Sequence, residues 1–115
     1  MREQEGPKGD EEALGVVVEF NLIPIGVGVS VSRFLASALK ELDKLNVKYT
    51  ITPMCTIFEA ESVGEAFKIV EAAHEALFKA GLKRVVTTVR IDDRRDVKRS
   101  MEDKVKSLKR SMGEN

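Results

Sequence analysis

Polar side chains that could bind a small molecule recur where apolar, strand-like stretches of this sequence end. Glu19 and Asn21 alternate with apolar residues early in the chain, and residues 49–59 form two short strand-like runs that meet at a tight turn. A third polar group comprises Thr88, Arg90, Asp92 and Asp93. Carboxylate, amide and hydroxyl groups together both donate and accept hydrogen bonds. The pattern therefore indicates a sheet with one apolar face and one face able to hold a small polar ligand.

The residues typical of catalytic and metal sites do not gather in the sequence. His74 has no nucleophile near it, so we interpret it as a packed or helix-surface histidine. Cys55 is the only cysteine, which excludes an intramolecular disulfide and a cysteine metal cluster; we interpret it as a turn or interface residue. Asp92 and Asp93 could bind a divalent ion, but ion pairs with the basic residues that follow are the favoured interpretation. We expect no enzymatic activity, no catalytic residue, no metal and no cofactor.

Bulk composition narrows the class of protein. The 115 residues allow one domain with a real core. The formal net charge is zero, which argues against a nucleic-acid partner, although residues 94–110 are basic and residues 2–12 are acidic. No apolar run approaches the roughly 18–20 residues that a membrane span needs. With a single cysteine and a polar start, the sequence leads us to expect a cytoplasmic protein without a membrane partner.

Hydrophobic periodicity and capping signals predict six elements and one further helix. Ser30 or Ser32 can cap the first helix and Asn46 can end it. Ser62 and Glu65 form a capping box for the second helix, and Gly81 falls where a left-handed C-terminal cap belongs. We expect a flexible extension over 1–14, strands at 16–23, 47–53, 56–61 and 83–92, and helices at about 31–45 and 62–80. A last helix is expected from about Asp96, with an apolar seam of Met101, Val105, Leu108 and Met112.

This order, β-α-β-β-α-β plus a C-terminal helix, is that of the ferredoxin-like α+β fold with an antiparallel four-stranded sheet. We place it in a single domain over residues 15–112. Both main helices cover one sheet face, and the other face is open to water or to another subunit. The set expected to face the helices is Val16, Val18, Phe20, Leu22, Ile51, Ile57, Val85, Val89 and Ile91; the set expected on the open face is Val17, Glu19, Asn21, Ile23, Thr50, Thr52, Thr88, Arg90 and Asp92.

Glu19 would lie in the middle of that open face, an unusual place for a carboxylate. Cross-strand pairing with Arg90 and contact with a ligand both account for it, and the two are compatible. Apolar residues such as Val17, Ile23 and Val86 share the face. This mixture is typical of a surface closed by a second subunit, where a pocket would combine apolar walls with a few polar groups.

Four stretches of the sequence, residues 18–26, 49–56, 73–76 and 83–95, closely resemble the small prokaryotic thiamine-binding protein family. The resemblance extends over roughly residues 16–108. It implies a ferredoxin-like fold assembled through its sheets into a homodimer or homotetramer. It also implies binding of thiamine or its hydroxymethylpyrimidine part, with no reaction. One departure is Cys55, which stands where the family usually has Gly, and Cys tolerates left-handed backbone poorly.

The chemistry of an aminopyrimidine suits several of these side chains. Its exocyclic amine would meet an acceptor such as the Glu19 carboxylate, which would also favour the positive thiazolium ring of thiamine. Asn21 and the threonine hydroxyls can donate and accept, and Met54 can stack on a ring face. The candidate ligand-binding residues are Glu19, Asn21, Thr52, Met54 and Thr56 first, with Ser30, Ser32 and Arg90 second.

Three hypotheses for the function follow from the sequence. The first is a non-enzymatic binding protein for thiamine or a related pyrimidine, with its pocket on the open sheet face near a subunit interface. The second is a structural or regulatory oligomeric module without a small-molecule ligand. The third is a small enzyme of thiamine or pyrimidine salvage, for which no acid–base pair or nucleophile is apparent.

Overall fold

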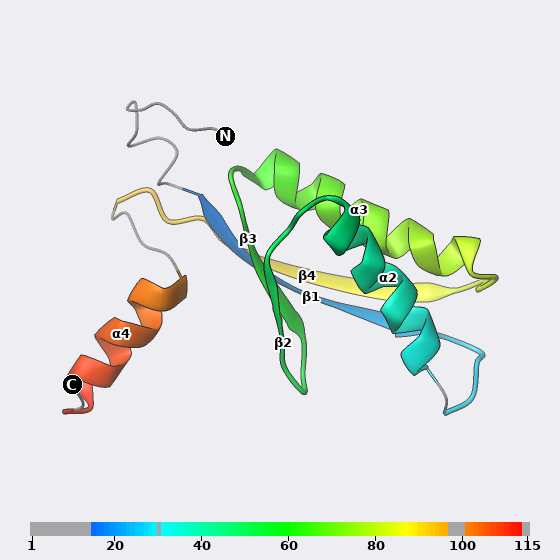
Figure 1. Cartoon of the computed structure of the whole chain (residues 1–115), viewed down its shortest axis with the longest axis horizontal. Coiled ribbons are helices and arrows are strands. Elements are labelled where there is room, and N and C mark those ends of the chain that lie inside the picture. Colours follow the sequence, from blue (N-terminus) through cyan, green and yellow to red (C-terminus); the bar gives the residue numbers. More distant parts are fainter. Residues whose placement is uncertain (1–14, 30, 97–100, 114–115) are drawn as a thin grey trace.

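A four-stranded antiparallel sheet with two helices on one face forms the body of the protein (Figure 1). The computed structural model describes residues 15–29, 31–96 and 101–113. The strands β1 (Val16–Pro24), β2 (Tyr49–Ile51), β3 (Thr56–Ala60) and β4 (Val85–Asp92) lie in the order β2-β3-β1-β4. The helices α2 (Ser32–Lys44) and α3 (Val63–Lys79) cover the sheet, and α4 (Met101–Ser111) stands apart from it. The predicted ferredoxin-like architecture is confirmed. The extension expected over residues 1–14 lies outside the described residues.

The core forms where β1, between β3 and β4, meets the two helices. Alternate residues of β1 point in opposite directions, so Val16, Val18, Phe20 and Leu22 are buried while their neighbours are not. The Phe20 ring packs edge-on against Phe58 of β3, with 5.7 Å between the ring centroids. From the helices, Leu42 of α2 and Leu77 of α3 are fully buried.

One residue of β3 lies on the opposite face of the sheet from the one expected. Ile57 was assigned to the helix-facing set, but Phe58 and Ala60 are the buried residues of this strand. Ile57 lies directly opposite Glu19 in the β1–β3 pairing, and directly opposed side chains share a face. The prediction for Ile57 is therefore wrong, because the larger Phe58 ring fills the core and strand alternation then turns Ile57 outward.

Both main helices end as the sequence predicts. Asn46 adopts a left-handed conformation (φ 58°) after α2, and the Val47 amide donates to the Leu42 carbonyl (2.9 Å). Gly81 (φ 108°) ends α3 in the same way, with the Leu82 amide donating to the Leu77 carbonyl (3.2 Å). These bonds satisfy carbonyls that a helix end leaves without partners. They also fix where the next strand starts.

The helix N-termini agree with the sequence only in part. The Ser62 hydroxyl accepts from the Glu65 amide (3.1 Å), as expected for the N-cap of α3. The Glu65 carboxylate, however, accepts from the Glu61 amide (2.7 Å) one residue before the cap. For α2 the N-cap position is Val31, without a side-chain capping bond, and Ser32 is already the first helical residue. Ser32 is therefore not the cap, and Ser30 lies outside the described residues.

Candidate functional site

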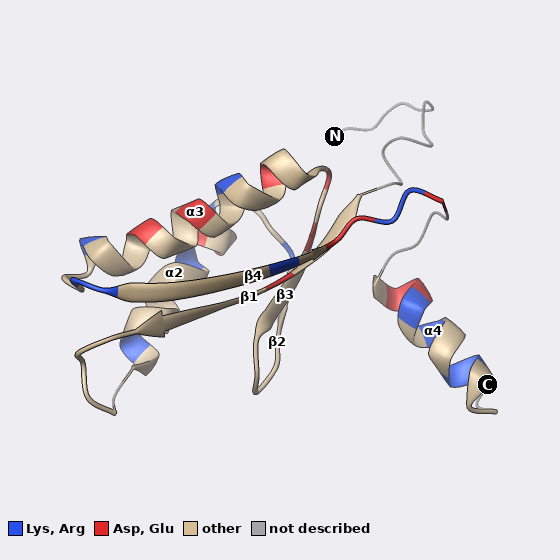
Figure 2. Ribbon diagram, turned by 180° about the vertical axis from the view of Figure 1, so that it is seen from behind, with Lys and Arg blue, Asp and Glu red and all other residues tan. Residues whose placement is uncertain are grey.

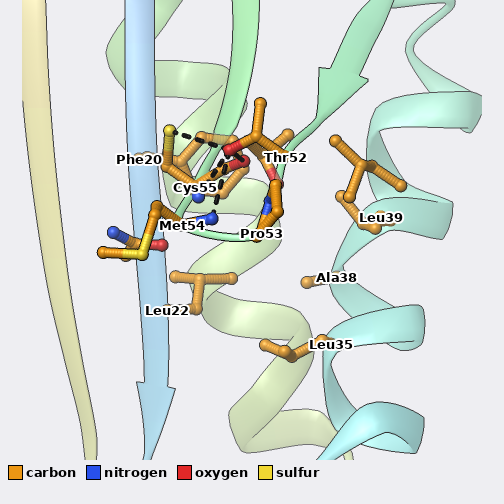
Figure 3. Close-up of a pocket in the computed structure, with 12 residues that line it drawn as sticks. Phe20, Leu22, Leu35, Ala38, Leu39, Thr52, Pro53, Met54 and Cys55 are labelled. Atoms are coloured by element: carbon orange, nitrogen blue, oxygen red, sulfur yellow. Dashed lines mark hydrogen bonds between the residues drawn. The ribbon is translucent and has the colours of Figure 1, made fainter.

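A cavity of about 170 Å³ lies between the β2–β3 turn, the middle of α2 and β1 (Figure 3). Leu35, Ala38 and Leu39 project into it from α2, at spacings that place them on one face of the helix. Phe20 and Leu22 of β1 supply a further apolar wall. The remaining lining residues are Asn21 of β1 and residues 51–56, which are Ile51, Thr52, Pro53, Met54, Cys55 and Thr56.

The turn that closes this cavity is organised by the Thr52 side chain. Its hydroxyl donates to the Cys55 carbonyl (2.9 Å) and accepts from the amides of Cys55 (3.0 Å) and Met54 (3.2 Å). Threonine hydroxyls stabilise turns in this way by replacing backbone partners. Since a hydroxyl has one donor and two acceptor lone pairs, that of Thr52 is fully engaged within the turn. Thr52 therefore holds Met54 and Cys55 in position.

Cys55 does not strain the turn. Among the described residues other than glycine, only Asn46 has a positive φ, so Cys55 needs no left-handed backbone. The Cys55 thiol lies beside the Thr52 hydroxyl, at 3.6 Å, within the turn. The departure from the glycine expected at this position is thus accommodated by ordinary backbone geometry.

The β1 strand brings polar groups to the cavity because β3 ends beside it. The β1–β3 pairing stops at Phe20 opposite Thr56, whereas β1 continues to Pro24 against β4 alone. Asn21 and Leu22 therefore line the cavity along a side of β1 that β3 no longer pairs. A strand edge offers backbone donors and acceptors in addition to side chains. The cavity combines apolar walls with a few polar groups, which is typical of small-molecule sites.

A second hollow, of about 470 Å³, lies on the open face of the sheet beside α4. The Arg90 guanidinium donates to the Glu19 carboxylate at 2.8 Å, directly across the β1–β4 pairing. This hydrogen bond, together with the opposite charge, raises the pKa of Arg90 above its ordinary value. The cross-strand pairing predicted for Glu19 is confirmed. The other residues that line the hollow are Val17, Ile57, Ile91, Asp92 and Lys104.

The structure divides the predicted site residues between these two places. Asn21, Thr52, Met54 and Thr56 line the cavity at the turn, while Glu19 and Arg90 line the open-face hollow. Ser32 lines neither of them. The cavity extends toward α2, on the helix-covered side of the sheet, whereas the sequence had suggested a pocket on the open face.

The contribution of α2 to the cavity was not predicted. Leu35, Ala38 and Leu39 belong to the apolar stripe of this helix, and in the sequence that stripe indicates only core packing. Nothing in their spacing distinguishes Leu42, which is fully buried, from the half-buried Leu39. Only the position of the β2–β3 turn relative to α2 determines which of these leucines lines the cavity.

The other polar groups considered from the sequence have structural partners. His74 Nδ1 lies 2.6 Å from the Thr87 hydroxyl, in agreement with a packed histidine. Arg95 donates two hydrogen bonds to Asp93 and so lowers the pKa of that carboxyl, whereas Asp92 pairs with Lys104 of α4.

Within the described residues, no three His, Cys, Asp or Glu side chains gather to hold a metal ion. No helix of the described chain is long and apolar enough to cross a membrane.

Comparison with known proteins gives a consistent result. Residues 18–109 match the model of the family described as thiamine-binding protein. A UPF0045 protein of Methanothermobacter thermautotrophicus is 47% identical over 95 residues, which cover 82% of this chain and 96% of that protein. A UPF0045 protein of Bacillus subtilis is 40% identical over 101 residues, covering 84% and 96% respectively. The chain belongs to the thiamine-binding protein family.

Solved structures agree with the fold. A hypothetical protein of Methanocaldococcus jannaschii superposes with a TM-score of 0.75 at 32% identity, over 83% of this chain and 96% of that one. A Thermotoga maritima protein, assigned provisionally to thiamine biosynthesis or salvage, superposes with a TM-score of 0.70 at 21% identity. The superposition covers 82% of this chain and 98% of that one. At the latter identity the likeness concerns the fold alone.

Proposed function

We propose that this protein binds thiamine, or its hydroxymethylpyrimidine part, without altering it, and that the pyrimidine ring enters the cavity between the β2–β3 turn and α2. The observation that carries the proposal is the size and lining of this cavity. An apolar protein cavity of about 150 Å³ accommodates benzene. The cavity of about 170 Å³ therefore has room for one substituted six-membered ring, and a second linked ring would extend out of its open side.

Recognition of the ring would come from the polar groups along one side of the cavity. An aminopyrimidine presents an amine donor and ring-nitrogen acceptors, which Asn21, the Thr56 hydroxyl and the edge of β1 can meet. The apolar residues from α2 would contact the ring faces, and Met54, which is 80% exposed, would cover the ring from the turn. Thr52 acts as a positioning residue, because its hydroxyl is engaged within the turn.

Glu19 would contact the second half of thiamine. It lies two residues before Asn21 on the same face of β1, a separation of about 7 Å along a strand. A thiazolium ring that extends past Asn21 onto the open face would bring its positive charge close to this carboxylate. Arg90 holds the carboxylate in place through the 2.8 Å hydrogen bond. Hydroxymethylpyrimidine alone would not reach Glu19.

The family supports a thiamine-related ligand, and the Thermotoga maritima relative bears a thiamine-related description. The relatives compared above carry no enzyme name. We therefore propose binding rather than catalysis. The alternative is an oligomeric module without a ligand. Titration calorimetry with each compound distinguishes the two, because the alternative produces no binding heat even at millimolar ligand. Chromatography of recovered thiamine tests for catalysis, and we expect the compound unchanged.

A pair of tryptophan variants tests the location of the site. Leu39→Trp places a large ring in the cavity, whereas Ala36→Trp places the same ring on the exposed side of the same helix. We expect Leu39→Trp to abolish binding of hydroxymethylpyrimidine, measured by calorimetry, and Ala36→Trp to bind as the parent protein does. Far-UV circular dichroism confirms that both variants are folded. Equal binding by the two variants would show that the ring binds elsewhere.

A further inference from the structure

The hollow on the open face of the sheet offers more room than the thiazolium ring placed there requires. Its volume is about 470 Å³, whereas the cavity of about 170 Å³ has room for one substituted six-membered ring. A thiazolium ring is five-membered and therefore smaller than the pyrimidine. Space for a further chemical group remains in the hollow once this ring lies against Glu19. The side chains that line the hollow indicate which group fits.

Two cationic side chains reach the hollow from different elements. Arg90 comes from β4 and Lys104 from α4, and basic segments of both elements are visible in Figure 2. The Lys104 ammonium pairs with Asp92, which follows Arg90 by two residues on the same face of β4. Two residues correspond to about 7 Å along a strand. The two cations are therefore neighbours along β4, on the side of the sheet that α2 and α3 leave open.

Both cations keep hydrogen-bond donors that the protein does not use. A guanidinium has five N–H donors and an ammonium has three. Within the described residues, Arg90 donates to Glu19 alone and Lys104 to Asp92 alone. The Arg90 side chain is 79% exposed, so its remaining donors face water. An anion in the hollow can thus be bound by both side chains while both ion pairs persist.

The proposed position of thiamine directs its alcohol into this space. The pyrimidine ring lies near Asn21 and the thiazolium ring near Glu19, so the ligand runs along β1 toward Val17, which is paired with Asp92 of β4. The thiazolium ring carries a hydroxyethyl chain, whose alcohol is the group esterified in thiamine phosphates. A neutral alcohol needs no cation, whereas phosphate is an anion that arginine and lysine commonly bind.

We infer that the hollow binds the phosphate of a thiamine phosphate ester, held by Arg90 and Lys104. The inference rests on the proposed function and extends it from thiamine to its phosphorylated form. Opposite charges then alternate along the ligand, because the Glu19 carboxylate faces the thiazolium ring and the two cations face the phosphate. Asp92 holds the Lys104 ammonium in place. The Asp92 side chain is 52% exposed, so water screens its repulsion of the phosphate.

Comparison of two ligands measures the effect. One exposed ion pair changes an affinity by about two- to threefold. With two cations, thiamine monophosphate should bind about fivefold more tightly than thiamine, measured by titration calorimetry of the full chain at low salt. Sodium chloride screens exposed charges, so raising its concentration should remove this preference. Binding of hydroxymethylpyrimidine, which is neutral and lies in the cavity, should not change with salt.

Lys104→Gln tests the location of the phosphate. Loss of one of the two cations should reduce the preference from about fivefold to about twofold. Thiamine has no anionic group for Lys104 to bind, so its own affinity should stay within about twofold of the parent value. Lys104→Arg keeps the charge and should keep the preference. The matched control is Lys106→Gln, which removes the same charge from an exposed position of α4 outside the hollow.

The outcomes separate this inference from the proposed function. If thiamine binds and thiamine monophosphate binds no more tightly, the inference is wrong and the proposed function stands. If none of the three compounds produces binding heat, both are overturned. Far-UV circular dichroism confirms that the variants are folded. A loss of preference in Lys104→Arg overturns the inference. So does an effect of Lys106→Gln as large as that of Lys104→Gln, because the phosphate would then respond only to overall charge.

Discussion

Replacing Thr52 by Val tests whether one hydroxyl organises the candidate site. The two side chains have nearly the same shape, so Thr52→Val removes the hydrogen bonds of the hydroxyl and little else. The bonds lost are the one donated to the Cys55 carbonyl (2.9 Å) and those accepted from the Cys55 (3.0 Å) and Met54 (3.2 Å) amides. The backbone bond from the Thr52 amide to the Cys55 carbonyl (2.9 Å) remains, so the turn is loosened rather than abolished.

The size of the effect follows from these three bonds. A hydrogen bond contributes about 0.5–1.5 kcal/mol net to folding. Met54 is exposed, so water replaces the lost partner of its amide, and the two bonds to Cys55, which is half-buried, account for most of the loss. We expect Thr52→Val to lower the free energy of unfolding by about 1–2 kcal/mol. Each kcal/mol corresponds to about 4–8 °C in Tm for a domain of this size.

Thermal unfolding followed by far-UV circular dichroism measures this loss, and calorimetry with hydroxymethylpyrimidine measures the effect on binding. Because a looser turn holds Met54 less firmly, affinity should fall by about fivefold, the equivalent of about 1 kcal/mol. Thr52→Ser is the matched control, because it keeps the hydroxyl and should retain most of the thermal stability and most of the affinity. A Tm unchanged in Thr52→Val, or lowered equally in Thr52→Ser, would refute the role assigned to the hydroxyl.

Two further predictions concern charge. Glu19→Gln should weaken thiamine binding by about two- to fivefold, since a half-buried carboxylate close to a cation contributes about 0.5–1 kcal/mol. It should leave hydroxymethylpyrimidine binding unaffected, and equal effects on both ligands by calorimetry would exclude the proposed arrangement. Tyr49, the only tyrosine, donates to Asp43 (3.0 Å), and this bond raises the pKa of Tyr49 above 10.0. The stability from this bond is therefore complete below pH 10 and is lost as the pH rises through the higher folded-state pKa. Asp43→Asn should return the tyrosinate absorbance titration toward pH 10, and an unmoved titration would contradict the assignment.

The sequence predicts the fold well because local signals and the global pattern agree. Alternation along β1 places Val18 and Phe20 inside, and Asn46 and Gly81 end the helices by a mechanism visible in the residue types themselves. The error at Ile57 arises because a strand with Ile and Phe next to each other has two apolar candidates for the core, and only the pairing with neighbouring strands decides between them.

The candidate site was harder to predict because it depends on distances between elements. The polar residues of the turn were identified from their types, but the wall that α2 provides was not. Leu35 and Leu39 continue the same helical stripe as the buried Leu42, and the sequence carries no mark of where the turn reaches that stripe. Glu19 and Thr52 were expected on one face, whereas the structure places them in separate hollows.

The alternation of β1 connects these two hollows. Phe20 and Leu22 face the cavity, Glu19 faces the open side, and Asn21 lies at the point where β3 ends and the two sides meet. A ligand of two linked rings, one neutral and one cationic, fits such an arrangement: the first ring needs an enclosed apolar space, and the second needs a carboxylate near water. Because successive strand residues point to opposite faces, four consecutive residues can serve both needs without any insertion in the fold. Glu19 and the turn would then control different parts of the affinity. Glu19 would determine the preference for thiamine over hydroxymethylpyrimidine, and Thr52 would affect the binding of both compounds.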